Sequence, residues 1–158
     1  MQLYLTNISF DGTMYHGWQV QNNGITVQEQ FQNALYKLYG FKPDVTGCRR
    51  TDAGVHAVEF YCHFDLNNYI SPNGVIKGLN SVLPQDIRVL DCKCVDSNFH
   101  ARYSSTGKNY IYRLDRREFP DPFNSRYSFN YSGNLNLRDI EYFCKSIVGE
   151  HDFAGFSS

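Results

Sequence analysis

The sequence has little of what would mark a membrane, secreted or strongly basic protein. No run of apolar residues exceeds three, whereas a membrane-spanning helix needs about 20. The first ten residues, MQLYLTNISF, contain no basic segment ahead of an apolar stretch, so we expect no signal peptide. Fifteen Lys and Arg against sixteen Asp and Glu give a net charge of −1. That balance argues against a basic nucleic-acid-binding tail, although it still allows a local basic groove.

The five cysteines form no zinc or redox motif. Their number is odd, and no two have the two-residue separation of a zinc knuckle. We interpret them as reduced, small apolar side chains in a cytoplasmic protein. His56 and His63 are seven positions apart on one expected strand, which sends them to opposite faces and disfavours a shared metal ion.

Hydrophobic periodicity predicts an α+β fold. Thr26 and Glu29 form a capping box ahead of a helix that ends at Gly40. Ser71 and Pro72 open a second helix, and a third is expected from about 137 to 148. Strands are expected over 2–10, 44–48, 57–65, 87–95 and 108–114, with Val58, Phe60, Cys62 and Phe64 on one buried face. This order predicts a mostly antiparallel sheet with helices on one face, built around a ferredoxin-like β-α-β-β-α-β half.

The loop 47–57 joins two expected strands and is rich in charged residues. It places Arg49, Arg50 and Asp52 within four positions. A carboxylate beside a guanidinium stays ionised, because the opposite charge favours the charged form. An ionised and partly shielded Asp52 can act as a nucleophile or as a base. The alternative is a structural turn, in which Asp52 caps its own backbone and Gly54 supplies a positive φ.

The segment 99–117 is both basic and aromatic. It contains five Lys or Arg residues and a single acid, Asp115. Interleaved cations and rings suit RNA, because phosphates contact the charges and unstacked bases contact the rings. The alternative is a solvated strand face beside an aromatic core face. The strict RNA-recognition-motif consensus is absent.

Four sequence blocks follow one another in the chain, namely Phe10–Thr13 with Gly17–Gln19, Arg50–Ala57, Phe99–Ser104 with Lys108–Tyr112, and Gly149–Phe153. In this order they resemble the tRNA pseudouridine synthase A family over nearly the whole chain. The second block is very specific, and the common order of all four makes chance a poor explanation. The resemblance implies the pseudouridine synthase fold and a catalytic portion over 1–158, with a first subdomain at about 1–98 and an incomplete second one at about 99–158.

The resemblance implies roles for particular residues. Asp52 matches the essential catalytic aspartate of the family. Arg50 matches the arginine that engages RNA and helps to hold the target nucleotide out of the stack. Tyr110 matches the tyrosine that stacks on the target uracil. Further substrate contacts are expected from Arg49, His56, Arg102 and Lys108.

The implied reaction isomerises uridine to pseudouridine in the tRNA anticodon stem-loop, where the family modifies positions 38–40. The N1–C1′ glycosidic bond breaks, the base turns, and C5 bonds to the sugar. Family chemistry leaves open whether the aspartate attacks the sugar, attacks the base or removes a sugar proton. The resemblance implies no cofactor and no essential metal, tRNA as the partner, and a cytoplasmic homodimer.

Two departures from the family pattern affect these expectations. Arg49 stands where the family usually has Gly, which would strain the loop if a positive φ were needed or would add a phosphate contact. Ser158 lies short of a typical family C-terminus, so we expect an N-terminal portion without a second basic partner for the aspartate, an apolar residue beneath the uracil and further strands. Sheet edges would then be open.

The alternative functions are a non-catalytic RNA-binding fragment, or a structural domain in which Asp52 is only a turn residue.

Overall fold

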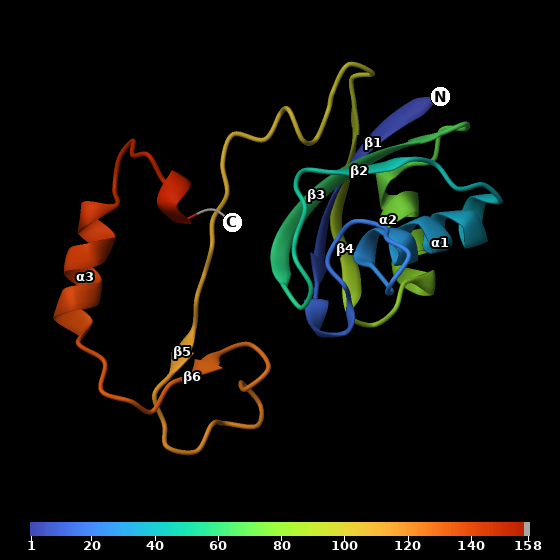
Figure 1. Cartoon of the computed structure of the whole chain (residues 1–158). Helices are drawn as coiled ribbons and strands as arrows, with labels where there is room; N and C mark the ends of the chain where they lie inside the picture. The colour runs from blue at the N-terminus through green and yellow to red at the C-terminus, as the bar shows by residue number, and fades with distance from the viewer. Residues whose placement is uncertain (157–158) are drawn as a thin grey trace. The chain divides into compact units, whose positions relative to one another are not determined.

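The computed structural model describes residues 1–156, which form two compact units. The first unit is Met1–Lys108, and the second begins at Asn109. In the first unit, two helices lie on one face of a four-stranded sheet (Figure 1). Within the described residues, no helix has the length and apolar character needed to cross a membrane. The elements of the first unit are β1 (Gln2–Phe10), the 3-10 turn η1 (Gly12–Met14), α1 (Val27–Tyr39), β2 (Val45–Gly47), β3 (Ala57–Leu66), α2 (Pro72–Val82) and β4 (Ile87–Val95).

The sheet is antiparallel and has the strand order β2-β3-β1-β4. β1 is central, and its Thr6 lies opposite Cys62 of β3 on one side and Cys92 of β4 on the other. The Thr6 hydroxyl donates to the Cys62 carbonyl oxygen at 3.1 Å. The prediction of an α+β fold with a mostly antiparallel sheet and helices on one face is therefore confirmed for this unit.

The core lies between the sheet and the two helices. Phe64 of β3 contacts Tyr4 of β1 and Phe31 of α1, with ring centroids 5.9 Å and 5.6 Å apart. Cys62 is fully buried in this layer, and burial raises the pKa of its thiol to about 12. The residues of the core that are completely buried include Ile8, Val27, Leu35, Val75, Leu79 and Ile87.

The strand alternation predicted for β3 holds for Phe60, Cys62 and Phe64, which are buried, but is wrong for Val58, which is 71% exposed. The pairing with β1 explains the difference. Ile8 lies opposite Phe60, whereas Phe10 lies opposite Ala57, so β3 carries an extra residue at this point. A β-bulge of this kind shifts the side-chain alternation by one position.

The predicted helix caps are confirmed. Thr26 Oγ1 accepts from the Glu29 backbone N–H at 3.3 Å, and Gly40 ends α1 with a φ of 78°. Ser71 Oγ accepts from the Gly74 N–H at 3.2 Å at the start of α2. These bonds satisfy backbone donors that a helix leaves unpaired in its first turn.

The second unit contains two short strands and a helix. These are β5 (Leu114–Asp115), β6 (Phe129–Asn130), α3 (Leu137–Ser146) and the 3-10 turn η2 (Ala154–Phe156). The strand predicted over 108–114 is wrong for most of its length, because only Leu114 and Asp115 pair with another strand, the parallel β6. Ile111 and Tyr112 are 74% and 88% exposed. An extended segment without a partner strand has no ladder of backbone hydrogen bonds to hold it.

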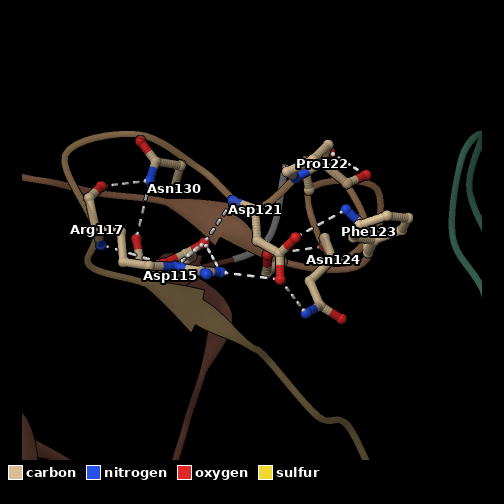
Figure 2. Close-up of polar contacts among 9 residues, drawn as sticks. Asp115, Arg117, Asp121, Pro122, Phe123, Asn124 and Asn130 are labelled. Atoms are coloured by element: carbon tan, nitrogen blue, oxygen red, sulfur yellow. Dashed lines mark hydrogen bonds and ion pairs between the residues drawn. The ribbon is translucent and has the colours of Figure 1, made fainter.

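Asp115 lies at the centre of a group of polar contacts in the second unit (Figure 2). It is the one buried residue among residues 109–156. Its carboxylate accepts from Arg117 Nε at 2.9 Å and from Arg117 Nη2 at 2.7 Å. These bonds hold the pKa of Asp115 well below its usual range. Asn130 Nδ2 donates to the carbonyl oxygens of Asp115 and Arg117 at 3.3 Å and 2.9 Å, which ties β6 to β5.

Candidate active site

The predicted reactive loop 47–57 lies against the loop 11–18 that follows β1. The backbone N–H of Trp18 donates to the Thr51 carbonyl oxygen at 3.2 Å, and the backbone N–H of Gly54 donates to the Tyr15 carbonyl oxygen at 3.1 Å. Gly17 has a φ of 81°, and a Cβ there would overlap the Thr51 carbonyl. A glycine at this position therefore permits both the turn and the close approach of the two backbones.

Trp18 is buried beneath the contact between the loops 11–18 and 47–57. It is 3% exposed, and its ring lies 4.3 Å from that of Phe60. A Cβ at Gly47 would lie only 2.6 Å from Trp18 Nε1. The indole thus occupies the space beside the glycine that ends β2, and Trp18 is a core residue.

His56 joins the far end of the reactive loop to η1. Its Nδ1 lies 3.1 Å from the Gly12 backbone nitrogen and 3.0 Å from Asp11 Oδ1. Nδ1 accepts from the Gly12 N–H when it carries no hydrogen, whereas it donates to the Asp11 carboxylate when it carries one, so the two contacts require different states of Nδ1. A Cβ at Gly12 would overlap the Val55 carbonyl oxygen, which again marks a close backbone approach. His56 therefore has a contact that anchors the loop whether or not Nδ1 carries a hydrogen.

Asp52 lies at the exposed turn of the loop. The Val55 backbone N–H donates to the Asp52 backbone carbonyl oxygen at 3.2 Å. Gly54 has a φ of 78°, which is the positive φ that the turn interpretation expects at this residue. The Asp52 side chain is exposed. In the described structure its carboxylate forms no ion pair with Arg49 or Arg50, so the expected charge pairing is not formed. The carboxylate is open to solvent and accessible to a large substrate.

A basic cleft of about 390 Å³ lies beside the reactive loop in the first unit. Arg49, Arg50, Arg102 and Lys108 line it, and no carboxylate does. Its wall is built on β2, whose Val45 carbonyl oxygen accepts from Gln28 Nε2 at 2.7 Å. The cleft is also lined by Trp18, Gln19, Gln28, Val45, Thr46 and Gly47. Four cations and no anion at one cleft create a local positive potential in a protein of nearly balanced charge.

The backbone at Arg49 is not strained. Among residues 1–156, positive φ values occur only at glycines, so the loop does not need a left-handed conformation at Arg49. The side chain is exposed and contributes a cation to the cleft. Of the two expectations for Arg49, strain is therefore wrong, and a phosphate contact stays a prediction.

Four of the predicted site residues line the same cleft of the first unit. Arg49, Arg50, Arg102 and Lys108 line one cleft, whereas Asp52 and His56 do not line it. Tyr110 belongs to the second unit, where it is 68% exposed. Sequence reasoning did not assign Gln28 or Thr46 to the cleft, because neither follows a recognisable binding pattern. In the part of the chain from residue 1 to 156, no group of three potential metal-ligating side chains occurs.

Comparison with known proteins identifies the family. The family model described as tRNA pseudouridine synthase matches residues 7–104, which include the reactive loop and Arg102. The chain belongs to the tRNA pseudouridine synthase family. Two proteins named tRNA pseudouridine synthase A are similar to it. The one from Clostridium kluyveri is 42% identical over 94% of this chain and 61% of its own length. The one from Lacticaseibacillus casei is 41% identical over 100% of this chain and 64% of its own length.

A third relative is the tRNA pseudouridine synthase A 2 of Bacillus anthracis, which is 36% identical over 100% of this chain and 65% of its own length. The chain thus spans about three fifths of the length of the first two relatives. All the predicted site residues lie within the stretch that the Lacticaseibacillus casei protein matches.

Proposed function

We propose that this chain carries the catalytic loop and an RNA-binding cleft of a tRNA pseudouridine synthase, an isomerase that converts uridine to pseudouridine. The observation that carries the proposal is the cleft lined by Arg49, Arg50, Arg102 and Lys108 beside a loop that holds Asp52. RNA phosphates supply the negative charge that such a cleft attracts. Membership of the tRNA pseudouridine synthase family supports this choice over other polyanions.

We propose the tRNA anticodon stem-loop as the substrate, with uridines at positions 38–40 as the targets. An enzyme that acts on a base within a stem must take the base out of the stack, at a cost of a few kcal/mol. Contacts of the cleft cations with the flanking phosphates offset part of that cost. We also propose that the protein acts in the cytoplasm as a homodimer.

Asp52 is the proposed catalytic carboxylate. The reaction breaks the N1–C1′ bond and forms a C5–C1′ bond; C5 loses a proton and N1 gains one, so atoms and electrons balance without an oxidant or reductant. The exposed side chain of Asp52 is accessible to a flipped nucleotide. Arg50 is proposed to hold the nucleotide, and Tyr110, which is 68% exposed, is proposed to stack on the uracil.

A second candidate function is RNA binding without turnover. The observation that favours it is the Asp52 carboxylate, which no described arginine pairs with. A catalytic carboxylate is usually held in place by neighbouring groups that fix its orientation and its charge. In this alternative the basic cleft still binds tRNA, but no isomerisation follows.

The test is pseudouridine formation in an unmodified tRNA transcript, detected by mass spectrometry after carbodiimide labelling. Asp52→Asn removes the charge with almost no change in shape. Asp91→Asn, at an exposed position on β4, is the matched control. Product from the wild type and the control, but not from Asp52→Asn, supports the proposal. Equal product from Asp52→Asn overturns the catalytic assignment.

Binding of the same transcript separates the two candidate functions. With four cations at the cleft, the logarithm of the association constant should fall against the logarithm of salt concentration with a slope no steeper than roughly −4. Salt-sensitive binding without any product favours the non-catalytic alternative. Absence of both binding and product contradicts both candidate functions.

A further inference from the structure

Beyond the basic cleft, a series of three aromatic rings in contact begins on the sheet face opposite the helices. His63 of β3 lies opposite Thr46 of β2, and Thr46 lines the cleft. The His63 ring centroid is 5.0 Å from that of His100, and the His100 ring is stacked on Tyr103 at 4.3 Å and 29°. The three rings therefore form a continuous series that begins next to the cleft and ends at Tyr103.

The loop 96–104 holds this series in a fixed arrangement. The Ala101 N–H donates to His63 Nδ1 at 3.1 Å, and Ala101 is only 3% exposed. The Ser104 N–H donates to the His100 carbonyl oxygen at 2.8 Å, which closes a turn around Tyr103. The loop is thus fixed both to the sheet and within itself, and its rings are held in place before any ligand arrives.

Tyr103 is the exposed end of the series. It is 81% exposed although one of its faces is covered by His100. Its neighbour in the chain, Arg102, is one of the cleft cations. An open aromatic face on a fixed loop beside a cluster of cations is the combination with which proteins bind unpaired nucleotides.

We propose that Tyr103 is a stacking surface for an unpaired base of the RNA whose phosphates occupy the basic cleft. The inference rests on the proposed function, because it requires RNA as the ligand. It assigns to Tyr103 a contact with a base, and to His100 and His63 the role of positioning residues that support the tyrosine ring from behind. Arg102 then contacts the adjacent phosphate.

The test compares two polyanions, an unmodified tRNA transcript and heparin, which has charge but no bases. Tyr103→Ala is expected to raise the dissociation constant for the transcript by roughly five- to hundredfold. It should leave heparin binding unchanged. Tyr103→Phe keeps the π surface and should bind both polymers as the wild type does.

Two further variants make the result specific. Tyr69→Ala removes another exposed tyrosine, which is 66% exposed and does not line the cleft, and it should affect neither polymer. Arg102→Gln removes a charge and should weaken binding of both polymers. Because Tyr103 is largely exposed, its variants should keep the wild-type thermal midpoint.

The outcomes distinguish this inference from the proposed function. If Tyr103→Ala binds the transcript as the wild type does while Arg102→Gln binds it less tightly, the stacking contact is refuted and the RNA-binding cleft stands. Equal loss of transcript and heparin binding in Tyr103→Ala also refutes stacking, since heparin has no base. A wild-type chain that binds no transcript refutes both.

Discussion

Substitution of Gly17 tests whether the two loops of the candidate site depend on their close approach. Gly17 and Gly40 have nearly the same φ, 81° and 78°, but a Cβ at Gly17 meets the Thr51 carbonyl and a Cβ at Gly40 meets nothing within 4 Å. An alanine in the left-handed region costs about 1 kcal/mol. Gly40→Ala should therefore lower the free energy of unfolding by about that amount.

Gly17→Ala carries the same conformational cost and adds a steric one. The overlap of the added Cβ with the Thr51 carbonyl forces that carbonyl away. The 3.2 Å hydrogen bond that it accepts from the backbone N–H of Trp18 is then lost, which costs about 1 kcal/mol. Displacement of the packed loop adds a comparable amount, for a total of roughly 3 kcal/mol. Urea unfolding followed by the fluorescence of Trp18, the one tryptophan of the chain, measures both variants.

The comparison has a second readout in RNA binding. Arg49 and Arg50 precede Thr51 in the same loop and line the cleft, so Gly17→Ala should weaken tRNA binding while Gly40→Ala leaves it unchanged. Equal losses of stability in the two variants would refute the reasoning, because they would show that the loops accept a Cβ at their contact without rearrangement.

Three other perturbations have expected outcomes. Thr51 Oγ1 is buried without a hydrogen-bond partner, so Thr51→Val should raise the free energy of unfolding by about 1 kcal/mol in urea titrations; a decrease would show that the hydroxyl is satisfied. Thr26→Ala removes the cap of α1 and should cost about 1 kcal/mol by the same measurement, whereas an unchanged midpoint would contradict the capping role. Desolvation, with a smaller contribution from the charge of His100, lowers the pKa of His63. Protonation of His63 therefore favours the unfolded chain. As the pH falls from about 7.5 through about 6.5, the pKa of His63 in the unfolded chain, the free energy of unfolding should fall more for the wild type than for His63→Gln. Parallel pH profiles of the two proteins would refute this.

Local signals in the sequence predicted the helices and the long strands well. The caps at Thr26 and Ser71 and the glycine at the end of α1 act through neighbouring backbone groups, so their effect is visible in the sequence itself. The bulge that exposes Val58 could not be predicted this way, because it depends on the pairing of β3 with β1.

The sequence suggested candidate site residues, but it did not predict how they are arranged in space. The Arg49–Asp52 stretch was recognisable from residue types and from family resemblance. The grouping of Arg49 and Arg50 with Arg102 and Lys108 was not, since the segments that follow β2 and β4 meet only when the whole sheet β2-β3-β1-β4 has formed. The strand predicted at 108–114 failed for a related reason, because extended residues become a strand only where a partner lies alongside.

The burial of Cys62 gives the protein a built-in chemical reporter. Cys94 and Cys144 are exposed, one in each unit, and a thiol-alkylating reagent reaches them directly. Cys62 is enclosed in the central layer with a pKa raised to about 12, so it offers almost no thiolate until the sheet opens. After a timed pulse of alkylating reagent, mass spectrometry gives the fraction of each cysteine that has been alkylated. The alkylation of Cys62, compared with that of Cys94 and Cys144, therefore reports how often the central strands open.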